Sequence, residues 1–398
     1  MDVVVTGIGL ISALGALRAT WQGLLAGKSG IQSRQPFAQV PPRPIALVNQ
    51  TPATLSQLTQ HVVADAIADA GLVPPLPECG VVVGSSRGNQ ALWEQMAREQ
   101  WQEARELRGS VQGETALIPS LLPPVPSNWL ETLPHAATVI AARQVHTTAI
   151  ALSPMAACAT GLWAIAQGAD LIRTGQYLQV IAGGVEAPIT PLTLAGFAQM
   201  GALAPTGAYP FDRDREGLVL AEGGAVLVLE SAAAAAQRGA TVYGRILGAG
   251  LTADGYHVSA PEPQSRAAIA AVQQCLTRSG LSHHDIDYIH AHGTATRLND
   301  RHEAHLIQSL FPPGVAVSST KGATGHAIGA SGALGAAFCL MALKHQQLPP
   351  CVGLTQPEFA LNFIAHPQSC PVNATLCLSF GFGGQNAAIA FAAASEAR

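Results

Sequence analysis

Two segments of the chain share one pattern. Each has Ala-Thr-Gly opening a long, helix-like run of small residues, "ACATGLWAIAQGADLIRTGQ" from Ala157 and "KGATGHAIGASGALGAAFCLMALK" from Lys321. Such self-similarity predicts two halves of one architecture, which we place at residues 1–239 and 240–398. Pseudo-symmetry would then bring the two helix starts face to face.

This alignment pairs the cysteine of the first segment with a position near a histidine in the second. Cys158 aligns with Gly322, and His326 lies four residues beyond that point. If the helix starts meet, a thiol and an imidazole come close together. The alignment thus predicts a site between the halves.

Short apolar β-branched runs alternate with helix-like segments along the chain. The runs "DVVVTG", "GVVVGS", "LQVIAGG" and "GAVLVLE" are typical of buried strands, whereas "LTQHVVADAIADAG", "ALWEQMAREQWQEARE" and "SRAAIAAVQQCLTRSG" have helical periodicity. This alternation predicts an α/β protein with helices covering a sheet. With 398 residues, 48% of them hydrophobic, the chain can bury a large core.

Composition excludes several classes of partner and site. A net charge of −4 without a basic run gives no general attraction to nucleic acid or to anionic lipid. The seven cysteines are scattered and never spaced CxxC, which favours reduced thiols, a cytoplasmic protein and no zinc ribbon. The N-terminal "MDVVVTGIGLISALG" has no basic segment and is expected to be a core strand rather than a signal peptide. The uncharged run 327–343 is short for a membrane span and predicts a buried helix.

Cys158 stands where small residues give way to the helix-like run. A thiolate is the reactive form of cysteine, and a helix N-terminus lowers the thiol pKa through its N–H groups and dipole. The position therefore predicts a partly activated nucleophile. The alternative is a packed core residue, since free cysteine is among the most buried residue types.

Two further clusters supply histidine and lysine. "YIHAHGTATRLNDRHEAH" contains four histidines, and "VSSTKGATGHAIGASG" contains Lys321 and His326. Histidine can donate a hydrogen bond to a developing oxyanion or move a proton near neutral pH. A metal site is the weaker interpretation of the four histidines, because two follow a strand and two lie on the next helix. They are His290, His292, His302 and His305.

These residues lie within motifs of a known family. The chain resembles a β-ketoacyl carrier-protein synthase of the thiolase fold, in the decarboxylating Cys-His-His class. The matching stretches, in family order, are "VVVTGIGLISALG", "LLAGKSGI", "ACATG", "PFDRDREGLVLAEGGAVLVLE", "HAHGTATRLND", "STKGATGHAIGASG" and "SFGFGGQNAAIAF". Each is weak alone, but together they cover the chain almost from end to end. The resemblance implies a five-layered α-β-α-β-α architecture with two pseudo-duplicated halves.

The resemblance also implies an activity and a catalytic set. Cys158 would take an acyl group from the phosphopantetheine thioester of an acyl carrier protein. His292 and His326 would hydrogen-bond the thioester carbonyl of a malonyl unit and stabilise the enolate formed as carbon dioxide leaves. That enolate would attack the acyl-Cys158 carbonyl, giving a 3-oxoacyl carrier protein. No metal and no cofactor besides the carrier's phosphopantetheine would be needed.

Supporting roles follow from the same resemblance. The N–H groups of Cys158 and Phe380 would form the oxyanion hole, with Phe380 also acting as a gate beside flexible glycines. Glu303 and Lys321 would form a buried ion pair that orients the histidines. Thr294 and Thr296 would hydrogen-bond the pantetheine arm.

The resemblance implies a dimer, either a homodimer or a heterodimer with a synthase-like subunit. In some pathways such a subunit is a non-catalytic partner that sets chain length. Those partners usually lack the nucleophile, whereas this chain keeps Cys158, both histidines and Lys321. An active acyltransferase is therefore favoured, in fatty acid, polyene, glycolipid or polyketide synthesis.

Several positions depart from the family pattern, namely Leu378, Ala221, Trp163 and the proline-rich stretch 117–135. The stretch falls where the family builds part of its acyl pocket and dimer interface, so these departures bear on acyl chain length. A competing motif is "GSSRG", which fits the GxSxG of an α/β-hydrolase with Ser86 as nucleophile. "SSTK" fits SxxK but lacks the companion motifs, and "LLAGKSG" lacks the first glycine of a P-loop.

Overall fold

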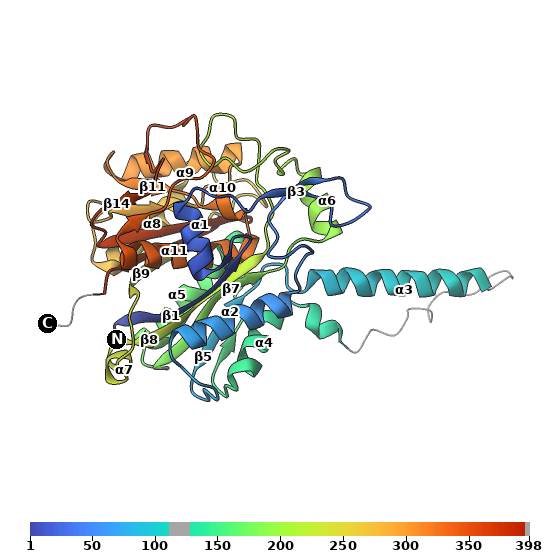
Figure 1. Cartoon of the computed structure of the whole chain (residues 1–398), viewed down its shortest axis with the longest axis horizontal. Helices are drawn as coiled ribbons and strands as arrows, with labels where there is room; N and C mark the ends of the chain where they lie inside the picture. Colours follow the sequence, from blue (N-terminus) through green and yellow to red (C-terminus); the bar gives the residue numbers. More distant parts are fainter. Residues whose placement is uncertain (111–127, 395–398) are drawn as a thin grey trace.

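The computed structural model describes residues 1–110 and 128–394. Its largest sheet has twelve strands, and its two ends are built alike (Figure 1). In the first half the strands run in the order β6 (Ala151–Leu152), β5 (Gly80–Gly84), β7 (Gln179–Glu186), β8 (Gly223–Ser231) and β1 (Val3–Ser12). In the second half they run in the order β13 (Asn362–Phe363), β11 (Ala316–Ser318), β10 (Tyr288–His290), β15 (Ala374–Gly381), β16 (Gln385–Ala392) and β9 (Gly244–Ala253).

The pairing directions repeat between the halves. β1, β8 and β7 pair antiparallel, and β7, β5 and β6 pair parallel. In the same way β9, β16 and β15 pair antiparallel, and β15, β10 and β11 pair parallel. The halves join where Val3–Val5 of β1 meets Gly244–Ile246 of β9. The predicted duplication is therefore present in the topology.

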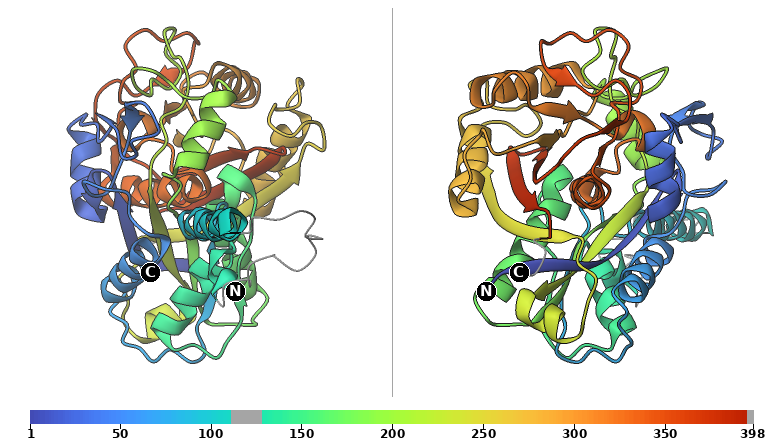
Figure 2. Two further views of the ribbon diagram at one scale, coloured as in Figure 1. Left: turned by 90° about the vertical axis from the view of Figure 1, so that its right-hand side faces the viewer. Right: turned by 60° about the vertical axis from the view of Figure 1, so that its left-hand side comes forward.

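Helices form three layers around these strands. α2 (Leu55–Asp69) and α4 (Ala136–Val145) cover the outer face of the first half, and α8 (Arg266–Ser279) and α9 (Arg297–Leu310) cover that of the second. α5 (Thr160–Arg173) and α11 (Ser331–His345) lie between the two halves (Figure 2). The resulting order, α-β-α-β-α, is the predicted five-layered arrangement.

The strand residues alternate between these layers, as a pleated sheet requires. Val226 and Val228 of β8 belong to the apolar cluster beneath α2 and α4, whereas Leu227 and Leu229 belong to the central cluster around α5 and α11. Because both faces are covered, these strands are apolar throughout. The expected buried strands near residues 2, 80, 178 and 224 are all confirmed.

The remaining elements connect or flank these layers. The connecting helices are α1 (Leu17–Leu25), α3 (Gln90–Ser110), α6 (Pro191–Gln199), α7 (Ala232–Gln237) and α10 (Lys321–Thr324), with the 3-10 turns η1 (Trp129–Thr132), η2 (Ala157–Ala159) and η3 (Ile328–Ala330). The short strands are β2 (Gly15–Ala16), β3 (Gln32–Arg34), β4 (Arg43–Ile45), β12 (Gln347–Leu348) and β14 (Gln368–Ser369).

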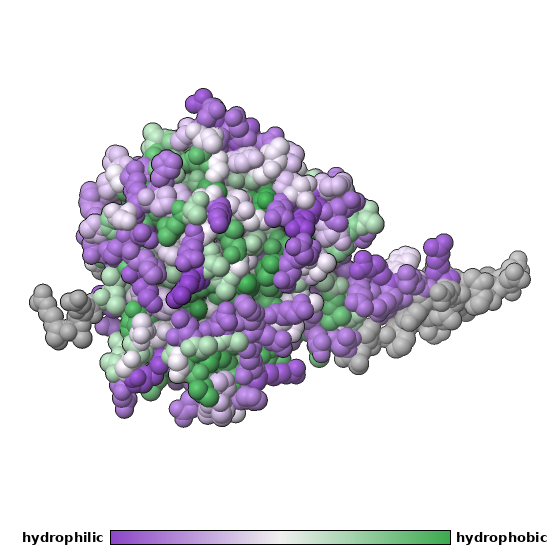
Figure 3. Space-filling view, viewed as in Figure 1, coloured by the Kyte–Doolittle hydropathy of each residue, from purple (hydrophilic) through white to green (hydrophobic). Residues whose placement is uncertain are grey.

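α3 projects from the body of the molecule (Figure 1). Hydrophilic residues spread over the visible face of the body and continue onto the described part of this projection, as Figure 3 shows. Of the proline-rich stretch 117–135, residues 117–127 lie outside the described residues. The predicted boundary at residues 239 and 240 falls between α7 and β9 and stays a prediction.

Of the described helices, one run is long and apolar enough to cross a membrane. It spans Ile328–His345, and 89% of it is buried inside the fold. Within this run the helix α11 has thirteen buried residues of fifteen. It is therefore the core helix that the sequence predicts.

The predicted alignment of Cys158 with Gly322 is wrong. Cys158 lies in the turn η2 directly before α5, and the matching turn η3 before α11 contains Gly329. Both turns begin at a residue with positive φ, 46° at Ala157 and 42° at Ile328. Ala-Thr-Gly in the second half instead ends the short helix α10, with Gly325 as its C-cap residue. The true counterpart of "ACATGL" is "IGASGA", seven residues further along.

The two helix starts meet at glycines. A Cβ atom on Gly161 of α5 would lie 2.6 Å from the backbone nitrogen of Ala333, and one on Gly332 of α11 would lie 2.9 Å from Leu162. Neither contact leaves room for a methyl group. The predicted face-to-face packing is therefore confirmed, and it depends on glycine at both helix starts.

We expect Gly161→Ala to destabilise the protein by about 1–3 kcal/mol, because the new methyl group overpacks against main chain that cannot rotate away. Denaturant unfolding measures this change. The matched control is Gly196→Ala in α6, where a Cβ meets no atom within 4 Å. There alanine should stabilise the helix by roughly 0.5–1 kcal/mol. Equal stabilities of the two variants would contradict the close approach of α5 and α11.

Candidate active site

A cavity of about 120 Å³ lies between the two halves. Cys158, His292 and His326 all line it, with exposed fractions of 5%, 2% and 2%. The Cys158 sulfur and one ring nitrogen of each histidine lie within 4.8 Å of one another. The structure thus brings together the three side chains that the sequence placed far apart along the chain.

Main-chain contacts from both halves fix the Cys158 turn. The Thr160 hydroxyl donates to the Ala157 carbonyl at 2.7 Å and accepts from the Ala156 N–H at 2.9 Å, which holds the left-handed Ala157 in place. From β15, the Ser379 hydroxyl donates to the Cys158 carbonyl at 3.0 Å. A Cβ on Gly381 would lie 2.6 Å from the Ala156 carbonyl oxygen. The end of β15 can therefore approach the Cys158 turn this closely only because residue 381 is glycine.

The pKa of the Cys158 thiol is raised, whereas the sequence predicts that it is lowered. Burial raises the pKa of Cys158 to about 11, although the Lys321 charge and a hydrogen bond from the Phe382 N–H act in the opposite direction. The helix α5 begins two residues after the cysteine, and removal from water outweighs what its N-terminus offers. The residue in the resting site is therefore a thiol.

His292 follows β10 and is held through its main chain and its ring. Glu303 of α9 accepts from the N–H groups of His292 and Gly293 at 2.6 and 2.7 Å. Lys321 donates to the His292 carbonyl and lies 3.5 Å from its Nδ1. Because an ammonium group can only donate, Nδ1 faces it as an acceptor and the ring proton sits on Nε2.

His326 lies opposite, with the two ring centroids 5.3 Å apart. Its Nδ1 is 2.7 Å from the Ser331 hydroxyl, and its main-chain N–H donates to the Val219 carbonyl. Burial and then the Lys321 charge hold the pKa of both histidines well below the usual range. Both rings are therefore neutral near pH 7 and can each offer one N–H.

The predicted ion pair between Glu303 and Lys321 is wrong as a direct contact. Among the ion pairs of the described residues, the charged atoms of these two side chains do not come within 4.0 Å. Each side chain instead holds the His292 main chain, Glu303 at the N–H and Lys321 at the carbonyl. They orient the histidine by bracketing its peptide groups.

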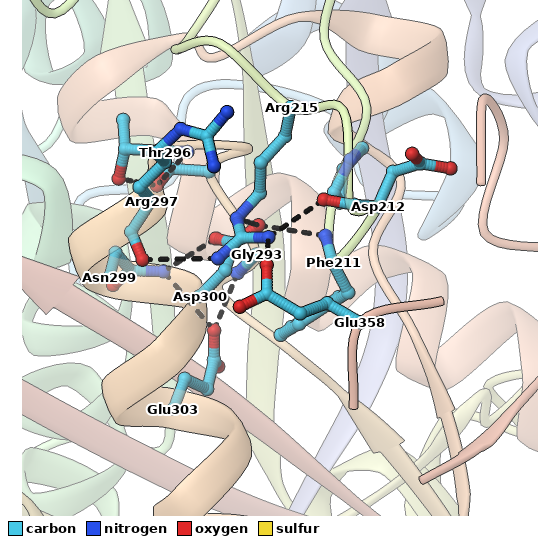
Figure 4. A network of polar contacts seen from close by, with 12 residues as sticks. Phe211, Asp212, Arg215, Gly293, Thr296, Arg297, Asn299, Asp300, Glu303 and Glu358 are labelled. Carbon is cyan, nitrogen blue, oxygen red and sulfur yellow. Dashed lines mark hydrogen bonds and ion pairs between the residues drawn. The ribbon is translucent and has the colours of Figure 1, made fainter. Parts of the chain in front are cut away.

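A polar network behind Glu303 involves residues for which the sequence suggested no role (Figure 4). Asn299 donates to Asp300 at 3.2 Å and to Glu303 at 3.3 Å. Asp300 in turn accepts from the Phe211 N–H at 2.8 Å and lies 3.6 Å from the fully buried Arg215. The motif "PFDRDREG" contains Arg215 and could have drawn attention to it. The carboxylates that pair with Arg215, on Asp300 and Glu358, lie far away in sequence. Burial raises the pKa of Asp300 to about 6 and that of Glu303 to about 7.

The main-chain N–H beside the Cys158 sulfur belongs to Phe382 and not to Phe380, the residue that the sequence predicts as second oxyanion donor and gate. Phe380 is the penultimate residue of β15, pairs with Asn386, and packs its ring against His292 at 6.0 Å between centroids. Phe382 lies two residues later and directs its N–H at the Cys158 sulfur. Phe380 and Phe382 are two residues apart, so in a strand their side chains would share one face, and the motif "SFGFGG" alone does not tell them apart.

Thr294 and Thr296 both line the cavity, and their hydroxyl oxygens lie 2.8 Å apart. The loop that carries them, after β10, includes Gly293 with φ 40° and Ala295 with φ 64°. A tight turn therefore directs both hydroxyl groups to one wall. The same cavity is lined by Asp254, Glu262 and the half-buried His302.

The histidines of the "HAHGTATRLNDRHEAH" stretch do not form a metal cluster of their own. His290 is a core residue bonded to Thr320, His302 contacts Ser265, and His305 is exposed. Among the described residues, the group with ligand spacing is Cys158, His292 and His326. The same three atoms also suit nucleophilic and hydrogen-bonding chemistry.

The hydrolase interpretation of "GSSRG" is not supported by the contacts of Ser86. Its hydroxyl donates to the buried carboxylate of Glu186, and a Ser nucleophile requires a histidine partner instead. Ser318 of "SSTK" is likewise buried against the Tyr288 hydroxyl at 2.7 Å. Both serines are therefore structural.

The three single-residue departures lie close to the site. Leu378 is buried in β15, and Ala221 packs so closely on Gly325 that a Cβ there would lie 2.8 Å away. Trp163 lies on α5, and its buried indole nitrogen has no hydrogen-bond partner among the described residues. The structure gives no reason for tryptophan at this position.

Comparison with known proteins identifies the family. Residues 53–235 match the family model for the N-terminal domain of beta-ketoacyl synthase, and residues 243–355 match that for its C-terminal domain. The 3-oxoacyl-[acyl-carrier-protein] synthase 2 of Synechocystis sp. is 34% identical, over 98% of this chain and 97% of its own.

Solved structures agree with this family. The ishigamide ketosynthase/chain length factor superposes with a TM-score of 0.86 at 27% identity, covering 99% of both chains. A type II PKS ketosynthase bound to the hexaketide, in complex with its acyl-carrier protein, gives a TM-score of 0.89 at 25% identity, again covering 99% of both chains. This chain belongs to the beta-ketoacyl synthase family.

Proposed function

We propose that this protein is an acyltransferase that condenses an acyl group, carried on Cys158, with a malonyl unit on an acyl carrier protein. The reaction is a decarboxylating Claisen condensation, as in fatty acid or polyketide elongation. The observation that carries the proposal is the approach of one thiol and two neutral imidazoles to within 4.8 Å in a cavity between the halves.

In the first half-reaction, the Cys158 thiol attacks the carbonyl carbon of an acyl thioester. The carbonyl oxygen gains negative charge, and the N–H groups of Cys158 and Phe382 are the fixed donors placed to receive it. The carbon–sulfur bond to the carrier breaks, the carrier leaves as a thiol with the Cys158 proton, and the acyl group stays on Cys158. Lys321 supports this step because its charge favours the anionic form of the sulfur.

In the second half-reaction, the malonyl thioester carbonyl lies between His292 and His326. Each neutral ring donates one N–H to its oxygen, which stabilises the enolate as the carboxylate leaves as carbon dioxide. The enolate carbon attacks the acyl carbonyl, the bond to Cys158 breaks, and the 3-oxoacyl product stays on the carrier. The sulfur then takes up a proton from water. Bracketing by Glu303 and Lys321 keeps His292 oriented throughout.

The carrier protein supplies the phosphopantetheine arm, and we assign the Thr294 and Thr296 hydroxyls to it because they line the wall of the cavity. The solved complex of a related ketosynthase with its acyl-carrier protein supports such a partner. A dimer is proposed as well, either of two copies or with a synthase-like subunit. The seven free thiols of the described chain favour a cytoplasmic location.

We expect the wild-type protein, mixed with acyl carrier proteins bearing graded chains, to gain the mass of one acyl group on the peptide that contains Cys158. Cys158→Ala should gain no acyl mass and lose condensation entirely, because it lacks the thiol that lies within 4.8 Å of a ring nitrogen of each histidine. Intact mass with peptide mapping measures both. Cys79→Ala, at another buried thiol, is the matched control and should behave as wild type.

An acyl adduct on Ser86 would contradict this assignment. A wild-type protein that takes no acyl group from any carrier, yet enables a partner subunit to condense, would instead be a non-catalytic chain-length-setting subunit.

His326→Ala should slow malonyl decarboxylation by roughly 100-fold or more while leaving acylation of Cys158 within about threefold, since His326 acts on the malonyl carbonyl. Carbon dioxide release from malonyl carrier protein and single-turnover acylation measure the two steps separately. His305→Ala, on the exposed face of α9, is the control for histidine removal. Equal losses in both steps would refute the separate role.

A further inference from the structure

The turn after β5 is tied to one buried carboxylate. Glu186, at the end of β7, accepts from the N–H groups of Ser86 and Arg87 at 2.9 and 3.0 Å, and from the Ser85 hydroxyl at 2.7 Å. The N–H of Gly88 donates back to the Ser85 oxygen at 3.0 Å. Successive amides of the turn are thus bound. They fix where the Arg87 side chain begins.

The Arg87 side chain packs behind one wall of the active-site cavity. Its guanidinium carbon lies 5.5 Å from the centre of the Phe197 ring, in a cation–π contact. Phe197 is 2% exposed and stacks on Phe382, with centroids 6.1 Å apart and planes at 20°. Phe382 directs its N–H at Cys158. Guanidinium, two rings and nucleophile therefore form one continuous row.

In the described part of the chain, the Arg87 guanidinium lacks the carboxylate partners that two other enclosed arginines have. Arg215 and Arg238 pair with carboxylates and also donate to carbonyl oxygens. Arg87 is half-buried, and its hydrogen bonding within the described residues is confined to its main-chain N–H. The five N–H donors of its guanidinium therefore have no protein acceptor there.

The residues packed around the nucleophile and Phe197 are apolar. Cys158 and Phe197 belong to one hydrophobic cluster with Ile189, Leu194 and Ile328. An acyl chain on Cys158 that extends along this cluster runs toward Phe197, and the guanidinium lies 5.5 Å from the centre of that ring. A plain alkyl end placed there removes water from the charge without replacing its hydrogen bonds, which is unfavourable.

An oxygen acceptor in the same place has the opposite effect. A guanidinium binds a carboxylate through two parallel N–H···O bonds and a ketone through one or two. Such a group would restore the hydrogen bonds that the protein itself does not supply.

We propose that Arg87 is a specificity-determining residue that selects acyl chains carrying an acceptor oxygen, a ketone or a carboxylate, over alkyl chains of equal length. The selection acts on chains long enough to pass Phe197. It rests on the proposed acylation of Cys158 and adds the substrate class to it. A two-carbon acetyl group ends beside the nucleophile and is not subject to the selection.

The test is the single-turnover rate of Cys158 acylation from acyl carrier proteins loaded with acetyl, octanoyl, octanedioyl or the octanoyl analogue with a ketone next to its terminal carbon. Wild type should accept at least one oxygenated chain about tenfold faster than octanoyl, equivalent to about 1.4 kcal/mol. The two oxygenated arms distinguish a ketone from a carboxylate as the natural group.

Arg87→Met keeps much of the side-chain volume and removes the charge, so it should abolish this preference and accept octanoyl faster than wild type does. Arg87→Lys keeps the charge without the planar fork and should retain part of the preference for the carboxylate. Arg18→Met, at an exposed arginine of α1, is the matched control and should keep the wild-type ratios.

Acetyl transfer separates the two proposals. If every variant accepts acetyl and all variants show the same ratio of oxygenated to octanoyl rates, the role of Arg87 is refuted while the acylation of Cys158 stands. A wild-type protein that accepts no chain at all, acetyl included, refutes the proposed function and the inference with it. Loss of acetyl transfer in Arg87→Met alone would show that Arg87 supports the fold or the nucleophile, which also overturns the selective role.

Discussion

The site depends on the close approach of two helix starts. α5 and α11 touch at Gly161 and Gly332, each in a space that excludes a methyl group. That contact joins the two halves of the fold where η2 carries Cys158 and where the chain before η3 carries His326. The duplicated topology explains why two such starts exist, and the glycines explain why they can meet. The cavity and its chemistry follow from this one packing constraint.

Burial sets the electrostatics of the site. Removal from water keeps His292 and His326 neutral and keeps Cys158 protonated, so the resting site holds few charges. The buried Lys321 opposes the effect at the sulfur and reinforces it at the histidines. A single cation can therefore assist thiolate chemistry while preserving the neutral N–H donors that an enolate needs. Arg87 adds a second cation on the far side of the aromatic pair.

Much of this organisation could be predicted from the sequence, and the errors have physical causes. Apolar β-branched runs predicted the strands because both faces of the sheet are covered. The motifs around Cys158, His292 and His326 predicted residues that do converge. The internal alignment failed because Ala-Thr-Gly recurs in a different element, whereas the true repeat is a 3-10 turn whose first residue is left-handed. Such a backbone feature leaves little trace in residue type.

The remaining errors concern which atom faces which. Phe380 and Phe382 are indistinguishable in "SFGFGG" until the end of β15 is known. Glu303 and Lys321 were predicted to pair, yet both bind the intervening peptide groups of His292. The roles of Asn299 and Asp300 depend on Arg215 and Glu358, which approach from distant segments (Figure 4). These contacts join residues that are far apart along the chain, so no short motif reveals them.

The most direct measurement of the central claim uses malonyl carrier protein labelled with ¹³C at its free carboxylate. The second substrate is a carrier protein that already bears an acyl chain. The purified protein should release labelled carbon dioxide and form 3-oxoacyl carrier protein in equal amounts. That equality shows that the thiol and the two histidines act on one reaction. Acyl transfer without carbon dioxide, or carbon dioxide release without the 3-oxoacyl product when acyl carrier protein is present, would contradict the account.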